Sequence, residues 1–109
     1  MWVDLGAEQL LGASQGARRI AVEVKSFIGE SDIVDLEQAV GQFVLYRVLL
    51  RTQEPERELW LAVPDDVWKT LFLEPVGEAI RAEALDRVLR VDPQREEIVQ
   101  WETTTPGAT

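Results

Sequence analysis

Glu23 and Lys25 are the residues of this sequence whose types and spacing are best suited to chemistry. They lie in residues 20–27, IAVEVKSF, where β-branched residues and a period of two predict a β-strand. Because side chains alternate along a strand, the carboxylate and the ammonium project from the same face. Such a pair suits phosphodiester hydrolysis, since the carboxylate can hold a divalent cation while the lysine positions water or stabilises developing charge. The alternative is a solvated ion pair on a half-buried strand, which would contribute little. The predicted strand places Ala21 and Phe27 on the face of Glu23 and Lys25, and Ile20, Val22 and Val24 on the other.

Asp4 is a second candidate carboxylate, within a predicted short strand over residues 1–5. A helical turn is predicted over residues 8–11, and a loop over residues 12–16 because that stretch is rich in Gly and Ser. If the first strand pairs antiparallel with the strand of Glu23, Asp4 lies close to the Glu23 carboxylate. Since a domain rarely begins inside a strand without an exposed lead-in, we expect upstream residues to be missing.

A long helix is predicted to follow the strand of Lys25. Gly29 ends the strand, Ser31 or Asp32 can cap the helix, and the helical pattern extends to about Leu50. Its apolar residues form a broad surface, so we expect the helix to pack against both the sheet and a second element. This surface consists of Ile33, Leu36, Val40, Phe43, Val44, Leu45, Val48, Leu49 and Leu50.

A line of polar side chains runs along this otherwise apolar helix. Gln38, Gln42 and Tyr46 follow one another at four-residue steps, which places them on one side of the helix. Beside a carboxylate–lysine site, their amide and phenol groups would support it by hydrogen bonds. The alternative is an ordinary polar edge of the helix that faces solvent.

The second half of the chain predicts three more strands. Residues 59–63, LWLAV, form a continuous apolar run ended by Pro64, which is typical of a central strand buried on both faces. Two short strands are predicted over residues 87–91 and 96–101, joined by a hairpin at residues 92–95.

Two further helices complete the predicted fold. Asp65 can cap a short helix, and Pro75 lies in the first turn of another that extends to about Ala84. The order of elements predicts an α/β fold with a mixed β-sheet flanked by helices and a right-handed crossover. Residues 1–102 are expected to form a single domain, and residues 103–109 a disordered tail.

Composition restricts the chemistry that this domain can perform. Apolar residues make up 46% of the chain, and four tryptophans also argue against disorder. Because cysteine and histidine are both absent, a bound metal would be a hard cation such as Mg²⁺ or Mn²⁺ held by oxygen. No membrane span or signal peptide is evident, which indicates a soluble cytoplasmic protein. The net charge of −9 argues against autonomous binding to DNA.

The spacing of the candidate residues resembles that of the restriction-endonuclease-like superfamily, often written PD-(D/E)xK. Asp4 is followed by Glu23-x-Lys25 on the next strand and by Gln42-x-x-x-Tyr46 on the helix, as in the RecB-like branch. The resemblance implies that Asp4 and Glu23 bind metal and that Lys25 is catalytic. Gln42 and Tyr46 would then support the site.

Several blocks of the chain resemble one family more closely, namely XisH, the cyanobacterial fdxN element excision controlling factors. These blocks are residues 3–8 (VDLGAE), 20–27 (IAVEVKSF), 35–43 (DLEQAVGQF), 61–65 (LAVPD), 92–94 (DPQ) and 98–101 (IVQW). The resemblance implies a role in programmed DNA rearrangement during heterocyst differentiation, beside a companion called XisI. XisH proteins are described as controlling factors, so nuclease activity does not follow from membership.

One departure from the family bears on partners. XisH proteins usually have an N-terminal helix and first strand before the segment that begins here at Met1. Without them, an edge strand or an apolar face is exposed, which predicts association with another chain, including a second copy. The sequence thus favours an excision-controlling factor with a nuclease fold, which would hydrolyse DNA phosphodiesters with a metal if it retains activity. The alternative is a non-catalytic subunit that acts through a XisI-like partner or a site-specific recombinase.

Overall fold

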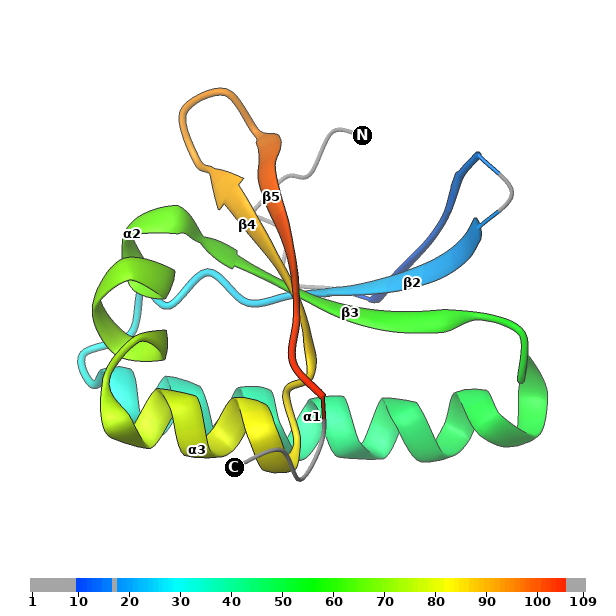
Figure 1. The fold of residues 1–109 in the computed structure, drawn as a ribbon, viewed down its shortest axis with the longest axis horizontal. Coiled ribbons are helices and arrows are strands. Elements are labelled where there is room, and N and C mark those ends of the chain that lie inside the picture. The colour runs from blue at the N-terminus through cyan, green and yellow to red at the C-terminus, as the bar shows by residue number, and fades with distance from the viewer. Residues whose placement is uncertain (1–9, 17, 106–109) are drawn as a thin grey trace.

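The computed structural model describes residues 10–16 and 18–105, which form one mixed sheet with helices packed against it (Figure 1). The strands are β1 (Leu10–Gln15), β2 (Arg18–Val24), β3 (Glu58–Pro64), β4 (Arg87–Asp92) and β5 (Glu97–Thr103). The helices are α1 (Asp32–Gln53), α2 (Asp65–Val67), the π-helical turn η1 (Trp68–Phe72) and α3 (Pro75–Glu83). No helix within the described residues is both long enough and apolar enough to cross a membrane.

The five strands lie side by side in their order along the chain. The inner pairs β2–β3 and β3–β4 are parallel, and the outer pairs β1–β2 and β4–β5 are antiparallel. Parallel neighbours need crossover connections, which α1 supplies between β2 and β3, and α2, η1 and α3 supply between β3 and β4. The predicted mixed α/β sheet with a central, doubly buried third strand is therefore confirmed.

The predictions for the N-terminal part were wrong where the structure describes it. The helical turn predicted to reach residue 11 and the loop over residues 12–16 are replaced by β1, which pairs with β2 so that Leu10 lies opposite Glu23. Pairing with a buried neighbour outweighs the local Gly and Ser content. The predicted strand at residues 1–5 lies outside the described residues, and so does Asp4.

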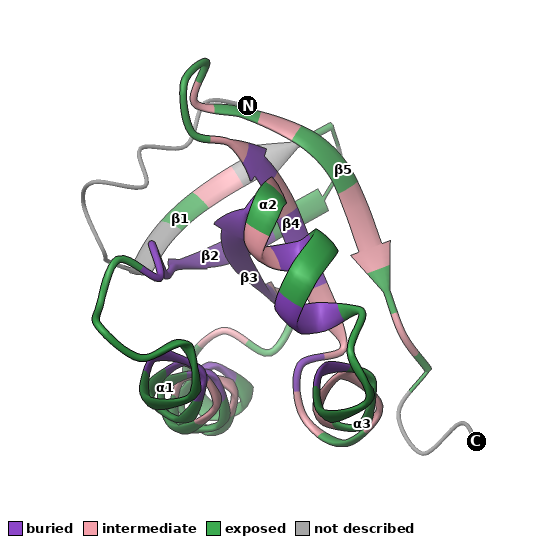
Figure 2. Ribbon diagram, turned by 90° about the vertical axis from the view of Figure 1, so that its left-hand side faces the viewer, coloured by how far each residue is buried: buried purple, intermediate pink, exposed green. Residues whose placement is uncertain are grey.

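The alternation predicted along β2 is confirmed by its packing. Ala21 and the following Phe27 belong to the core between the sheet and the helices, whereas Ile20, Val22 and Val24 belong to a core on the opposite face. The described helices lie on the first face, where α1 and α3 run beside each other (Figures 1 and 2). On the second face, the Trp101 ring of β5 packs edge-on against Trp60 of β3, with ring centroids 4.8 Å apart.

The cap of α1 was predicted correctly, but the packing of its apolar surface was not. The Ser31 hydroxyl accepts a hydrogen bond from the Val34 amide at 3.3 Å. Only part of the apolar surface is used, since Leu36, Ala39, Phe43 and Leu50 are buried against the sheet. The other side of α1 carries large apolar residues that are 37–55% exposed: Ile33, Val34, Val44, Leu45, Val48 and Leu49. We call these six residues the outer α1 face, and in the described part of the chain no second element covers it (Figure 2).

Asp65 plays a different role from the predicted helix cap. Its carboxylate accepts a hydrogen bond from Arg90 of β4 at 2.7 Å and pairs with Lys69 at 3.1 Å, and it makes no capping bond to α2. Burial raises the pKa of Asp65, but the hydrogen bonds and charges of Arg90 and Lys69 outweigh it and hold the pKa below its usual value. Asp65 therefore fastens the short α2 to the sheet.

Candidate functional site

Glu23 and Lys25 lie where β2 ends, on the face of the sheet covered by α1. Their residues are only 2% and 5% exposed, respectively. The solvated surface pair considered from the sequence is therefore wrong. The Lys25 amide donates to the Ala62 carbonyl at 3.0 Å, which continues the parallel pairing with β3 one residue past β2. This bond fixes the direction in which the Lys25 side chain leaves the sheet.

The Lys25 ammonium is held by two side chains of α1. Its Nζ donates to Gln38 Oε1 at 2.9 Å and lies 3.7 Å from Asp35 Oδ1. The side chains of this ion pair are 7% and 10% exposed, so the charges interact with little screening by water. Gln38, predicted as a supporting residue, thus contacts the predicted catalytic lysine directly, and it does so as a hydrogen-bond acceptor.

Asp35 is the site residue that sequence reasoning missed. It lies one turn after the Ser31 cap, and its Oδ2 accepts a hydrogen bond from the Gly29 amide at 3.0 Å. A Cβ atom on Gly29 would lie 2.8 Å from both carboxylate oxygens, so a larger residue there would displace the Asp35 carboxylate. The available signal was an acidic residue near a helix N-terminus, preceded by a glycine in the connection from the lysine strand.

The connection between Lys25 and α1 has an unusual backbone conformation. Phe27 has a φ of +56°, a left-handed value that a bulky L-residue rarely adopts. Its side chain is buried, and its ring packs edge-on against Phe72 of η1 at 5.9 Å between centroids. Packing of the Phe27 ring therefore holds the turn by which the chain leaves β2 and enters the loop before α1.

The other predicted supporting residues lie farther along α1. Gln42 is exposed, and Tyr46 is half-buried and packs against the core between helix and sheet. Of the predicted polar line on this helix, the structure thus brings Gln38 to Lys25. The roles proposed for Gln42 and Tyr46 remain predictions.

The predicted metal ligands are only partly within the described residues. Glu23 is buried at the end of β2, but within residues 10–16 and 18–105 no three Asp, Glu, His or Cys side chains gather to hold a metal ion. Asp4 lies outside the described residues, so its role as a ligand remains a prediction. Glu23 fits an oxygen-ligated Mg²⁺ or Mn²⁺ by its chemistry, and the described part of the chain does not complete the set.

Comparison with known proteins decides the family. The family model for the XisH protein matches residues 1–99. The chain belongs to the XisH family. A crystal structure of an XisH family protein from Nostoc punctiforme PCC 73102 superposes with a TM-score of 0.82 at 41% sequence identity, covering 86% of this chain and 74% of that one.

A second XisH-like structure gives the same result. A crystal structure of a fdxN element excision controlling factor protein from Anabaena variabilis has a TM-score of 0.81 at 41% identity, again covering 86% of this chain and 74% of the other. A comparison with curated proteins finds no match. A sequence identity of 41% means that this chain shares its fold with both structures because they belong to one family. The resemblance of its sequence blocks to XisH is thereby confirmed.

Proposed function

We propose that this XisH-family protein acts in the control of DNA element excision, the role by which its Anabaena variabilis relative is named. We further propose that it hydrolyses DNA phosphodiester bonds at the site of Glu23 and Lys25. The observation that carries this proposal is the burial of Lys25 at the end of β2, with its ammonium held by Gln38 and Asp35. A lysine placed by side chains on a neighbouring helix is organised before a substrate arrives.

Each residue of the site would have a distinct role. Asp4 and Glu23 would hold Mg²⁺ or Mn²⁺, which supplies activation of the attacking water when it is bound. The Lys25 ammonium would orient that water or stabilise the negative charge that develops on the phosphate. Gln38 and Asp35 would keep the ammonium in place without contacting the substrate.

The negative net charge of the chain indicates that a partner would bring DNA to the site. At −9, the chain repels the phosphate backbone, and binding of DNA by such a chain alone would be weak. A XisI-like protein or a site-specific recombinase with a basic surface would bring the DNA to the site.

The proposal is tested by measuring Mg²⁺- or Mn²⁺-dependent cleavage of DNA by the purified chain and by variants. Glu23→Gln removes the buried charge at nearly constant size, and we expect at least a hundredfold loss of cleavage because the metal would lose a carboxylate ligand. Glu37→Gln makes the same change at an exposed position on α1 and should leave cleavage unchanged. Equal residual cleavage in both variants would contradict the proposal, as would no cleavage by the wild type with and without its partner.

A second candidate function, a non-catalytic protein-binding subunit, is favoured by the outer α1 face. A stripe of large apolar residues on a helix normally faces a core, yet Leu45 and Val48 on the outer α1 face are 55% and 52% exposed. A second copy would also carry a charge of −9 and be repelled, so we propose a XisI-like protein as the occupant of this face.

Replacing Leu45 and Val48 together with glutamine tests this second function. We expect the affinity for a co-expressed XisI-like protein to fall at least tenfold, because about 1.4 kcal/mol or more of apolar contact would be lost. Val99→Gln, which changes an equally exposed residue on β5, should have no effect on binding. Unchanged co-purification of the double variant would exclude this face, and dimers of the wild type that dissociate in the double variant would assign it to self-association.

A further inference from the structure

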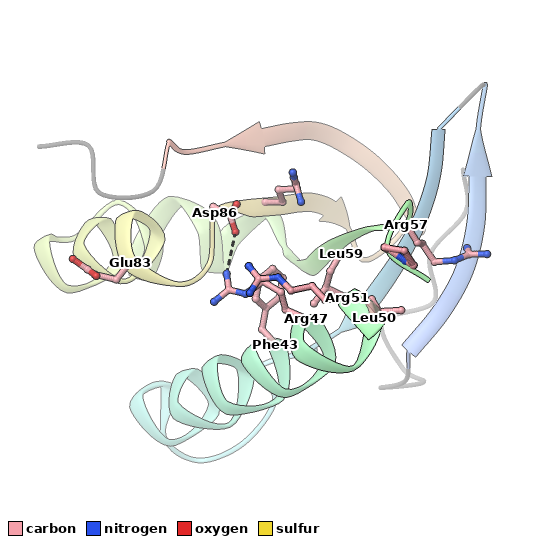
Figure 3. A pocket seen from close by; sticks show the side chains of 10 residues that line it. Phe43, Arg47, Leu50, Arg51, Arg57, Leu59, Glu83 and Asp86 are labelled. Atoms are coloured by element: carbon pink, nitrogen blue, oxygen red, sulfur yellow. Dashed lines mark ion pairs between the residues drawn. The ribbon is translucent and has the colours of Figure 1, made fainter. Parts of the chain in front are cut away.

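A cavity of about 440 Å³ lies at the opposite end of α1 from Lys25 (Figure 3). Its walls come from the second half of α1, from the start of β3 and from the connection between α3 and β4. Thirteen residues of helix separate Gln38, which contacts Lys25, from Arg51 at the cavity, a distance of about 20 Å at 1.5 Å per residue. The cavity is therefore not part of the site described above.

Arginine is concentrated in this cavity. Arg47, Arg51, Arg57 and Arg87 line it, four of the 11 basic residues in a chain whose net charge is −9. Two acidic residues, Glu83 and Asp86, share the described lining, and Glu54 pairs with Arg57 at 3.2 Å, so four arginines face three carboxylates and an excess of one positive charge remains. A local excess of the sign opposite to that of the whole chain indicates attraction of an anion.

Two of the four arginines are fixed by contacts that build the walls. Arg47 lies 3.8 Å from Asp86 and donates to the Ala84 carbonyl at 3.3 Å, which joins α1 to the end of α3 (Figure 3). Arg57 donates to the Ile20 carbonyl at 2.7 Å and thereby joins the start of β3 to β2. These guanidinium groups hold the cavity open between the elements.

The other two arginines are available to a ligand. Within the described residues, no ion pair or hydrogen bond involves the side chains of Arg51 or Arg87. Arg51 extends from the last turn of α1 and Arg87 from the first residue of β4, so they approach the cavity from different elements. Two guanidinium groups from two sides can bind the oxygens of one phosphate group in bidentate fashion.

The floor of the cavity is apolar. Phe43, Leu50 and Leu59 line it and are at most 9% exposed, so they belong to the core and present only part of their surface. A volume of this size is in the range typical of sites for small organic ligands. Because so little of these three side chains is exposed, a ligand would be held mainly through its charged group by the arginines.

From these observations, we infer that this cavity binds a small organic phosphate monoester through Arg51 and Arg87. A phosphate monoester carries about −1.5 to −2 charges at pH 7, which the two guanidinium groups of Arg51 and Arg87 would balance. A mononucleotide is a suitable probe, since its phosphate suits the arginines and its organic body suits a cavity of this volume. The inference does not depend on the proposed nuclease activity.

Calorimetric titration of the full chain with adenosine 5′-monophosphate tests the inference. We expect binding by the wild type that weakens at least tenfold in Arg51→Gln and in Arg87→Gln. Arg95→Gln removes the same charge from the exposed turn between β4 and β5, and it should bind within twofold of the wild type. Thermal melts of all variants should agree, because neither Arg51 nor Arg87 makes a contact that the described fold needs.

Five results would overturn the inference. Absence of binding by the wild type at millimolar ligand would do so, as would an equal loss in Arg95→Gln, which would indicate a general charge effect. Equal binding of adenosine would exclude recognition of the phosphate, and equal binding of inorganic phosphate would exclude recognition of the organic body. If a short DNA duplex binds through Arg51 and Arg87 while the mononucleotide does not, the cavity belongs to a nucleic-acid surface instead.

Discussion

Replacing Lys25 with methionine is expected to lower the free energy of unfolding by about 3–5 kcal/mol. The substitution keeps the length and apolar stem of the side chain but removes the ammonium between Gln38 and Asp35. The Asp35 carboxylate, 10% exposed, would then remain buried without the cation that offsets its loss of hydration. Urea denaturation followed by circular dichroism measures this change as a shift of the midpoint at constant slope.

Two further variants distinguish this explanation from a general effect of losing a lysine. Lys69 pairs with Asp65 at 3.1 Å but is 61% exposed, so Lys69→Met should cost no more than about 1 kcal/mol. Combining Lys25→Met with Asp35→Asn removes both buried charges and should restore part of the stability. A Lys25→Met variant as stable as Lys69→Met, or a double variant less stable than Lys25→Met, would contradict the buried pair as the cause.

The strength of this pair also bears on the proposed mechanism. Lys25 is needed for stability as well as for the proposed chemistry, so loss of cleavage in a Lys25 variant alone would not separate the two roles. Glu23→Gln and Glu37→Gln form the sharper comparison, because both keep the size of the side chain. Thermal melts of these two variants show whether a loss of cleavage reflects folding or chemistry.

Local patterns were sufficient for most of the fold. The period of two correctly assigned both faces of β2, because each face is buried in its own core, although the strand ends at Val24 and not at the predicted residue 27. The unbroken apolar run before Pro64 correctly indicated a central strand, and Pro75 correctly marked the first turn of α3. In each case, the local residues show both the type of element and which of its faces are buried. The prediction therefore did not depend on any distant part of the chain.

The failures have one physical cause, which is dependence on parts of the chain that are distant in sequence. β1 contains Gly and Ser but is a strand because β2 supplies its hydrogen-bonding partner. The apolar surface of α1 is wider than the sheet can cover, and periodicity alone does not show which side stays exposed. Asp35 acts through Gly29 and Lys25, and an acidic residue near a helix N-terminus does not by itself show which distant group it contacts.

Changing Gly77 to alanine is expected to cost about 3 kcal/mol or more, through overpacking against the backbone. Gly77 is buried in the first turn of α3 where it meets η1. An added Cβ would meet the Leu71 carbonyl oxygen and lie 2.5 Å from the Phe72 Cα and 2.7 Å from the Phe72 carbonyl carbon. Because these are backbone atoms, no side-chain rotation relieves the contact, and α3 must move away from η1. Thermal and urea unfolding measure the loss.

Gly41→Ala is the matched control, because it makes the same change in the middle of α1, where an added Cβ meets nothing within 4 Å. Alanine is the better helix former, so this variant of the isolated chain should gain about 0.5–1 kcal/mol. If the free energy of unfolding falls in Gly77→Ala and rises in Gly41→Ala, close backbone packing, and not helix propensity, makes Gly77 necessary. The displacement in Gly77→Ala would also reach the candidate site, since Phe72 packs against Phe27 in the connection after Lys25. Equal stability of the two variants would mean that α3 can shift away from η1 at little cost. The contact between α3 and η1 would then not hold the connection between β2 and α1 in place.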